Sequence, residues 1–297
     1  MNAMPSLVRR NMKLFFKDKG MFLTALITPA ILLVLYATFL GNVYRDSFLM
    51  NLPETVQLSE KLINGLVASQ LASSLLAVSC VTVAFCSNFL MVQDRANGSA
   101  KDLRICPVRS SVLSAGYYIA TLLSTLLICL VAWGICLVYV AVSGWYMSIS
   151  DVLLLLVDVV LLVLFGTALS SVINFFLSSQ GQISAVGTVV SAGYGFICGA
   201  YMPISSFGEG LQKVLSFLPG TYGTALVRTH AMQGAMAELE NQGIPAAVVA
   251  SMKDALDCNL YFFGNQVSLP VMYLILGGTV AVLIALYILM NAFDKRR

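Results

Sequence analysis

The sequence predicts an all-α, polytopic membrane protein. Of its 297 residues, 59% are apolar and only 10% are charged, whereas a soluble domain carries about 25% charged residues. The apolar residues form long unbroken runs, and a helix needs about 20 of them to cross the hydrocarbon core of a bilayer. Transmembrane β-strands would instead show alternation over segments of about 10 residues. These observations exclude a secreted disulfide scaffold, a disordered chain and a soluble enzyme.

Six runs are long enough to be transmembrane helices. We expect one membrane domain that covers residues 1–297, with a polar loop at 93–111 and a large polar segment at 204–268. The second and third runs are long enough to tilt or to extend beyond the bilayer. The six predicted spans are residues 21–41, 65–92, 112–142, 151–176, 183–203 and 269–292.

The basic residues predict the orientation of these spans. Residues 1–20, the loop 93–111 and the last three residues together carry twelve of the 17 Lys and Arg residues. Cytoplasmic loops of membrane proteins carry an excess of Lys and Arg. We therefore expect both termini and the loop 93–111 in the cytoplasm, and the segment 204–268 outside.

The chain begins with a segment that differs from the spans. Within residues 4–19, apolar side chains such as Leu7 and Phe15 fall near one helix face, while Arg9 and Lys13 belong to a basic row on the other face. A cationic amphipathic helix of this kind lies in the membrane interface without crossing it. We predict such a helix here.

The sequence lacks the material for a catalytic or metal centre. His230 is the only histidine, so neither a His-based metal cluster nor a Ser-His triad can form, and we expect it to be a solvated loop residue. The seven cysteines lack metal-ligand spacing and are interpreted as small apolar fillers. No GxxxxGK[ST] phosphate loop is present. We therefore expect no metal, no cofactor and no nucleic acid to bind this chain.

Two features within the predicted spans suggest function or packing. Asp158 follows Asp151 by seven residues, which places it about 10 Å into the fourth span. Because a charge in the bilayer is costly, Asp158 is either a pathway residue or a buried packing partner. Gly187, Ser191 and Gly195 recur every four residues on the fifth span. Such small residues allow close helix packing, either within one subunit or between subunits.

Two stretches carry recognisable motifs. The first, DRANGSAKDLRICPV at residues 94–108, combines an acidic and basic entry with Gly98, Leu103 and Pro107. The second is GAYMPIS at 199–205, followed by FLPGTY at 217–222 and ALVR at 225–228. Both resemble motifs of the ABC-2 type permease family, the membrane subunits of many ABC exporters, although Ser99 replaces the usual Thr. The order of the predicted elements also resembles this family along nearly the whole chain.

The resemblance implies a permease that dimerises, with itself or with a similar chain, and that works with two copies of a cytoplasmic ABC ATPase. That ATPase would bind ATP and Mg²⁺, and this chain would not itself be an enzyme. The N-terminal helix and residues 94–107 would contact the ATPase through Arg9, Arg10, Lys13, Asp94, Arg95, Gly98, Leu103 and Pro107. Short external or re-entrant helices over residues 203–228 would close an outer gate that includes Gly199, Pro203, Phe217, Leu218 and Pro219.

We therefore expect an exporter in the cell membrane of a bacterium. A path lined by apolar, Ser/Thr and Gly residues favours an amphipathic cargo such as a drug, a peptide antibiotic or a lipid-like product. Residues 229–268 are interpreted as an external cap, with amphipathic helices at 235–239 and 246–256. Two alternatives stay open: a secondary carrier or channel, and a membrane sensor of the same fold that moves no substrate.

Overall fold

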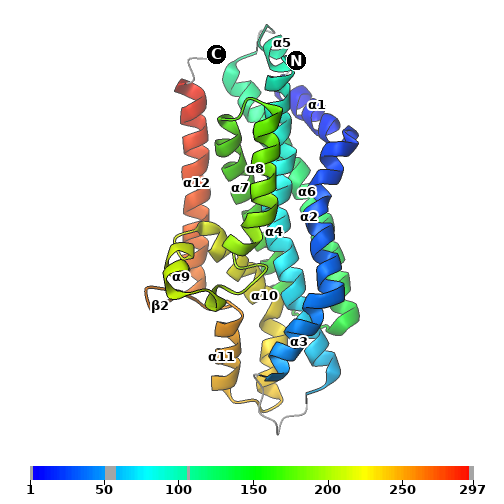
Figure 1. Ribbon diagram of the computed structural model, residues 1–297, viewed down its shortest axis with the longest axis vertical. Helices are drawn as coiled ribbons and strands as arrows, with labels where there is room; N and C mark the ends of the chain where they lie inside the picture. The colour runs from blue at the N-terminus through cyan, green and yellow to red at the C-terminus, as the bar shows by residue number, and fades with distance from the viewer. Residues whose placement is uncertain (1–2, 51–57, 106–107, 294–297) are drawn as a thin grey trace.

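The computed structural model describes residues 3–50, 58–105 and 108–293, which form an elongated bundle of helices (Figure 1). The fold class predicted from the sequence is confirmed, since the only strands among the described residues form one short hairpin. The elements are α1 (Ala3–Lys17), α2 (Lys19–Leu35), the π-helix η1 (Tyr36–Leu40), α3 (Gly41–Met50), α4 (Glu60–Ala96), α5 (Ser99–Ile105), α6 (Ser110–Gly144), α7 (Ile149–Phe175), α8 (Gln180–Ile197), the 3₁₀ helix η2 (Ile204–Ser206), α9 (Glu209–Leu215), α10 (Pro219–Asn241), α11 (Ala246–Ala255), β1 (Leu260–Phe262), β2 (Asn265–Val267) and α12 (Leu269–Phe293).

Helix α4 forms the centre of the bundle. It packs against α2, α6, α7, α8 and α10, and nearly all of its residues from Leu62 to Val92 are buried. Many of these residues are small or carry a hydroxyl. Ser73, Ser79 and Thr82 each donate a hydrogen bond to a carbonyl three or four residues earlier, which satisfies the hydroxyls inside the helix. These three buried hydroxyls are therefore satisfied within α4 itself.

Within the described part of the chain, five helical segments are long and apolar enough to cross a membrane. The first comprises residues 19–46, in which α2 continues through η1 into α3, and the others are α4, α6, α7 and α12. The predicted fifth span, residues 183–203, corresponds to α8, which is shorter and is not one of these five. That α8 crosses the bilayer stays a prediction.

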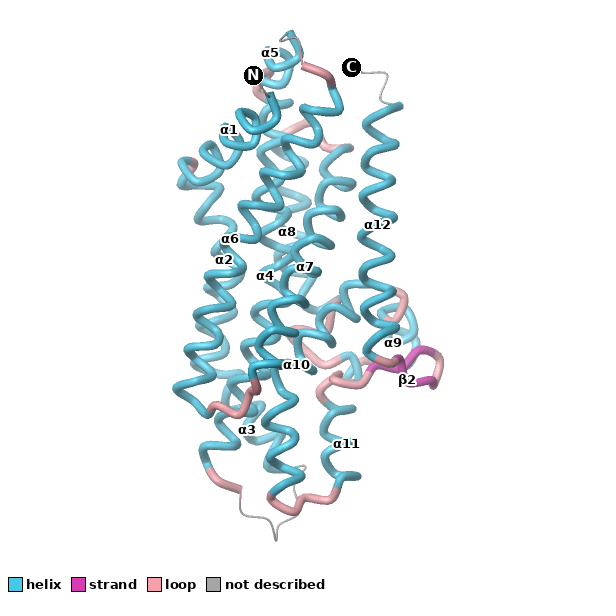
Figure 2. Tube along the Cα trace, turned by 180° about the vertical axis from the view of Figure 1, so that it is seen from behind, coloured by secondary structure: helices cyan, strands magenta, loops and turns pink. Residues whose placement is uncertain are grey.

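The two ends of the bundle differ in the elements that they carry. The start of α1, the short helix α5 and the end of α12 lie at one end, whereas α3, α11 and the C-terminal half of α10 lie at the other (Figures 1 and 2). We call these the α5 end and the α11 end. The described parts of the two basic segments 1–20 and 93–111 thus lie at the α5 end.

The segment after α8 agrees only in part with its prediction. The short helices η2 and α9 lie within residues 203–218, but from Pro219 onward α10 forms one helix of 23 residues, most of them buried, and it packs against α4, α7 and α12. Gly220 and Gly223 both lie inside α10. A Cβ on Gly220 would lie 2.7 Å from Oη of Tyr194, and one on Gly223 would overlap the Leu162 side chain. These glycines therefore permit close helix packing.

The structure also differs in part from the two amphipathic helices predicted after residue 228. Residues 235–239 continue α10 and do not form a helix of their own, whereas α11 occupies most of the expected 246–256. β1 and β2 then pair antiparallel, with Leu260 opposite Val267. Together with η2 and α9, these pieces lie beside the bundle toward the α11 end (Figure 1).

Candidate functional site

At the α5 end, an ion pair joins α1 to the central helix. Nη1 of Arg10 lies 2.7 Å from Oδ2 of Asp94, and Nη2 donates to Oδ1 at 3.3 Å. The hydroxyl of Tyr117 on α6 donates to the same carboxylate at 2.5 Å. Burial lowers the pKa of Arg10, but the hydrogen bond and the charge of Asp94 outweigh it and raise the pKa above its ordinary value. One buried carboxylate thus holds three helices together. Its bidentate, charge-assisted pairing with the guanidinium is stronger than a hydrogen bond between neutral groups.

The three basic residues of α1 that are predicted to contact an ATPase divide into two groups. Arg10 points inward to Asp94, whereas Arg9 and Lys13 are exposed on α1. The opposite face of α1 packs on α6, where Leu7 lies against Gly116. Arg10 is therefore a positioning residue for α1, and Arg9 and Lys13 are the ones available to a partner.

Arg95, which follows Asp94 on α4, holds the end of α7. Nη1 of Arg95 donates to the carbonyls of Asn174, Phe175 and Leu177, the shortest bond being 2.7 Å to Phe175. Its guanidinium also lies 5.6 Å from the centroid of the Phe175 ring. A cation at the C-terminus of a helix satisfies its last carbonyls and complements the helix dipole. Arg95 therefore fixes the end of α7 to the end of α4.

The short helix α5 follows directly. Gly98 has φ +83°, a left-handed conformation that favours glycine, and it turns the chain from α4 into α5. Leu103 lines an apolar cavity of about 300 Å³ together with Leu7 and Arg10 of α1, while Ile105 is 84% exposed. Of the predicted contact residues, Pro107 lies outside the described residues. The other predicted contact residues lie on α1, at the end of α4, in the turn after it and on α5, and α1 and α5 line the same cavity.

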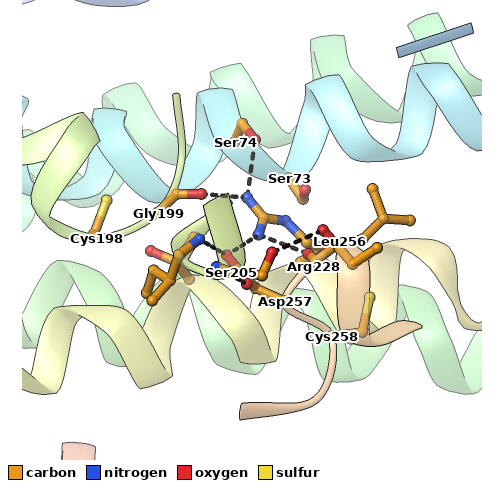
Figure 3. Close-up of polar contacts among 12 residues, drawn as sticks. Ser73, Ser74, Cys198, Gly199, Ser205, Arg228, Leu256, Asp257 and Cys258 are labelled. Atoms are coloured by element: carbon orange, nitrogen blue, oxygen red, sulfur yellow. Dashed lines mark hydrogen bonds and ion pairs between the residues drawn. The ribbon is translucent and has the colours of Figure 1, made fainter. Parts of the chain in front are cut away.

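Toward the α11 end, a second centre is built around Arg228 of α10, which is fully buried (Figure 3). Nη1 donates to the carbonyl of Leu256 at 2.8 Å and lies 3.5 Å from Oδ2 of Asp257. Nη2 donates to the carbonyl of Gly199 at 2.7 Å and to Oγ of Ser74 on α4 at 3.4 Å. The carbonyls of Gly199 and Leu256 follow the ends of α8 and α11. One guanidinium thus joins four helices.

Asp257 completes this centre from the turn after α11. It accepts the backbone N–H groups of Ile204 at 2.5 Å and Ser205 at 3.3 Å. Burial raises the pKa of Asp257, against the charge of Arg228 and these two backbone donors. Gly199 has φ +74° at the end of α8, and a Cβ there would lie 3.2 Å from the Asp257 carboxylate. The motif residues Gly199 and Arg228 are therefore in direct contact.

A third polar cluster lies within the bundle. Oδ2 of Asp158 on α7 lies 2.6 Å from Nδ1 of His230 on α10, and Oδ1 accepts the hydroxyl of Tyr273 on α12. Asp158 and His230 are 1% and 3% exposed. The prediction that His230 is a solvated loop residue is therefore wrong. Its helix continues through a stretch that hydropathy alone assigns to a loop, and its imidazole is satisfied by a carboxylate 72 residues away.

The other predicted gate residues lie at two places. Pro203 precedes η2 beside the Arg228 centre, and Pro219 is the first residue of α10. Phe217 is 62% exposed, with its ring centroid 5.2 Å from that of Phe262 and 5.9 Å from that of Phe263 in the hairpin. Leu218 connects it to Pro219. The structure places these residues before η2 and between α9 and α10, and does not bring them into one cluster.

The small residues of α8 contact this same chain. A Cβ on Gly187 would lie 3.3 Å from the Phe89 ring of α4, and one on Gly195 would overlap the Tyr201 ring. The Tyr201 hydroxyl donates to the carbonyl of Ser191 at 3.3 Å. Two of the three positions are thus used for packing within the subunit, while much of the rest of α8 is exposed.

A comparison with protein-family models matches residues 3–230 with the ABC-2 type transporter family. The chain belongs to this family. The match covers α1 to His230, including the Arg10–Asp94 ion pair, α5 and Arg228, whereas Leu256 and Asp257 of the Arg228 centre lie beyond it. No match is found among the curated proteins compared with the chain. The protein is thus an ABC transporter permease, a multi-pass transport subunit, and we refer to it as the permease.

Proposed function

We propose that the permease is the membrane subunit of an exporter whose energy comes from a separate ATPase docked at the α5 end. The observation that supports this proposal is the contact region between α1 and α5, where Leu7 and Arg10 of α1 line one cavity with Leu103 of α5. Both segments are exposed and basic, and both are fixed to α4, by Arg10–Asp94 and by the Gly98 turn. A force on α5 would therefore act directly on α4, the central helix of the bundle.

Helix α4 supports transmission from one end to the other. Its 37 residues extend about 55 Å at 1.5 Å per residue, and Ser74, far from α5, contacts Arg228. Binding of ATP and Mg²⁺ by the partner would pull two α5 helices together in a dimer of permeases. The buried α4 would carry this movement to the centre that holds the ends of α8 and α11.

The permease would lie in the cell membrane of a bacterium with its α5 end in the cytoplasm, because the basic residues of α1 and of the α5 segment lie there. Its exposed apolar helices would contact membrane lipid. The cargo that suits an apolar and hydroxyl-lined bundle is amphipathic, such as a drug, a peptide antibiotic or a lipid-like product. The partner permease is a second copy or a similar chain.

A proton-driven carrier would need a carboxylate that is accessible to cargo and solvent. Asp158 is the only Asp or Glu in the interior of the five described apolar segments away from their ends, and both its oxygens are occupied by His230 and Tyr273. This arrangement favours coupling to an ATPase. A non-transporting sensor would retain the same contacts and is distinguished only by the absence of flux.

The test is ATP-driven export from vesicles that contain the permease and its captured ATPase. We expect flux of at least one probe among a fluorescent amphipathic cation, a labelled lipopeptide and an NBD-labelled phospholipid, only when ATP is present. Flux that is equal with and without ATP, or no flux for any probe, would contradict the proposal.

The same assay tests the contact region between α1 and α5. Leu103→Asp places a charge in the cavity beneath α1 and should lower ATP-driven flux at least tenfold, while the ATPase continues to hydrolyse ATP. Leu103→Met keeps the contact apolar and of similar volume, and it should retain wild-type flux. Unchanged flux in Leu103→Asp would show that this contact region does not couple ATP hydrolysis to transport.

A further inference from the structure

Three exposed aromatic rings meet on the pieces that lie beside the bundle. Phe217 follows α9, Phe262 ends β1, and Phe263 is the next residue. The ring centroid of Phe217 lies 5.2 Å from that of Phe262 and 5.9 Å from that of Phe263, and the last two are 4.9 Å apart. We call these three residues the Phe217 cluster. The hairpin that supplies two of its rings lies beyond residues 3–230, which match the family.

The turn of the hairpin holds one of these rings at a cost. Phe262 pairs with Asn265, so the loop consists of Phe263 and Gly264, with φ +49° and +84°. Two positive φ values are the requirement of a type I′ turn, which favours Asn or Asp before Gly. A bulky side chain is strained in this conformation, and Phe263 is nevertheless 59% exposed. Apolar surroundings that cover the ring would offset both costs.

Helix α9, which leads into Phe217, has a polar face and an apolar face. Glu209, Gln212 and Lys213 line a cavity of about 560 Å³ between α9, the start of α10 and the hairpin. Leu211 and Val214 do not line this cavity and are exposed. Residues three apart lie on the same side of a helix, so these two form one apolar face. This division is typical of a helix that lies in a membrane interface.

Helix α12 indicates the depth of the Phe217 cluster. Its 25 residues extend about 37 Å at 1.5 Å per residue, a few Å more than the hydrocarbon core of about 30 Å. Only Ser268 separates β2 from α12, and α9 and the hairpin lie beside the first turns of α12 in both views (Figures 1 and 2). The cluster is therefore level with the boundary of the hydrocarbon core.

The same turns of α12 continue the apolar surface. Val271 and Leu274 are exposed, and Leu274 is 74% exposed. They belong to a helix that is long and apolar enough to cross the membrane, so lipid is the partner available to them. Exposed apolar patches mark contacts with proteins or membranes. Because the Phe217 cluster adjoins this lipid-facing surface at the level of the boundary, its position favours lipid.

We propose that the Phe217 cluster, together with Leu211 and Val214, inserts into the membrane leaflet at the start of α12 and binds the headgroup-proximal part of the lipid acyl chains. The polar face of α9 then points away from the chains. Since β1 begins three residues after Asp257, this contact also ties the Arg228 centre to the membrane surface. The proposal depends on the membrane location of the permease and not on its proposed coupling to an ATPase.

The experiment measures the surroundings of single tryptophans in the full-length permease in phosphatidylcholine and phosphatidylglycerol nanodiscs. The two native tryptophans are removed by Trp133→Phe and Trp145→Phe. Phe263→Trp and Phe217→Trp are then introduced separately, so that a loss of folding in one leaves the other. We expect acyl chains brominated near the headgroup to quench about half of the fluorescence of each, and chains brominated near their ends to quench less, as for an interfacial ring.

Two matched variants calibrate the measurement. Leu274→Trp on α12 should be quenched by brominated lipid and protected from iodide in the water. Ala247→Trp, at an exposed position of α11, should show the opposite behaviour. The iodide quenching constants of Phe263→Trp and Phe217→Trp should be at least fivefold lower than that of Ala247→Trp. Thermal midpoints identify the variants that fold.

The pair of quenchers distinguishes lipid from the other possible surroundings. Quenching by iodide as strong as in Ala247→Trp would show that the cluster faces water. Resistance to both quenchers would show that it is buried against a second copy of the permease or another protein. Either result in the folded variants would overturn the proposal, and stronger quenching from the chain ends would overturn its interfacial depth.

Discussion

Replacing Arg228 with methionine is expected to lower the free energy of unfolding by about 3–5 kcal/mol, the range for breaking a buried ion pair from one side. The substitution leaves the buried carboxylate of Asp257 without its cation. It also leaves the carbonyls of Gly199 and Leu256 without their donor. The measurement is the thermal midpoint of the detergent-solubilised permease, followed by fluorescence-detected size exclusion.

Two controls show whether the cost arises from the unpaired charge. Arg45→Met breaks an exposed pair with Glu60 and should cost less than about 1 kcal/mol. The double variant Arg228→Met/Asp257→Asn should recover part of the loss, because no bare charge remains. A midpoint of Arg228→Met within one degree of wild type would show that this centre does not hold the four helices.

Asp158→Leu is expected to have a comparable effect, a loss of about 3–5 kcal/mol. It removes the acceptor of His230 and Tyr273 at once, and so loosens α7 from both α10 and α12. Asp158→Asn keeps an oxygen for Tyr273 and a polar group for His230, so it should lose much less. The thermal midpoints of the two variants, measured side by side, test this order.

The export assay then decides between packing and pathway for Asp158. Because both carboxylate oxygens are occupied by the protein, we expect Asp158→Asn to retain ATP-driven flux per folded molecule. If Asp158→Asn keeps its midpoint but loses flux at least tenfold, the charge itself serves transport. Our interpretation of Asp158 as a packing residue would then be wrong.

Much of the architecture follows from hydropathy and local signals. Long apolar runs predicted the fold class, and the alternation of Leu7 and Phe15 with Arg9 and Lys13 predicted the N-terminal helix. The motif at residues 94–108 marked the segment after α4 as a contact region through its resemblance to the family. These features depend on residues that are near each other in the sequence, where helical periodicity is a direct signal.

The contacts that hold the sites could not be predicted in this way. Arg10 and Asp94 are 84 residues apart, and Asp158 and Tyr273 are 115 apart. His230 was misplaced because α10 contains Arg, His and Glu side chains, and its burial depends on partners from other helices. The glycines of α10 gave the same ambiguity, since a glycine permits a turn or a close helix contact and the sequence does not distinguish them.

The most direct test of coupling at the α5 end is the amount of ATPase that co-purifies with the affinity-tagged permease when both are expressed in the native host. Ile105 on α5 is 84% exposed, so Ile105→Asp should not disturb folding but should lower the captured ATPase at least tenfold. Leu211→Asp makes the same type of change on α9, a helix of equal length toward the other end, and capture should stay at the wild-type level. Capture that is unchanged by Ile105→Asp, or no ATPase captured by the wild-type permease, would contradict the account.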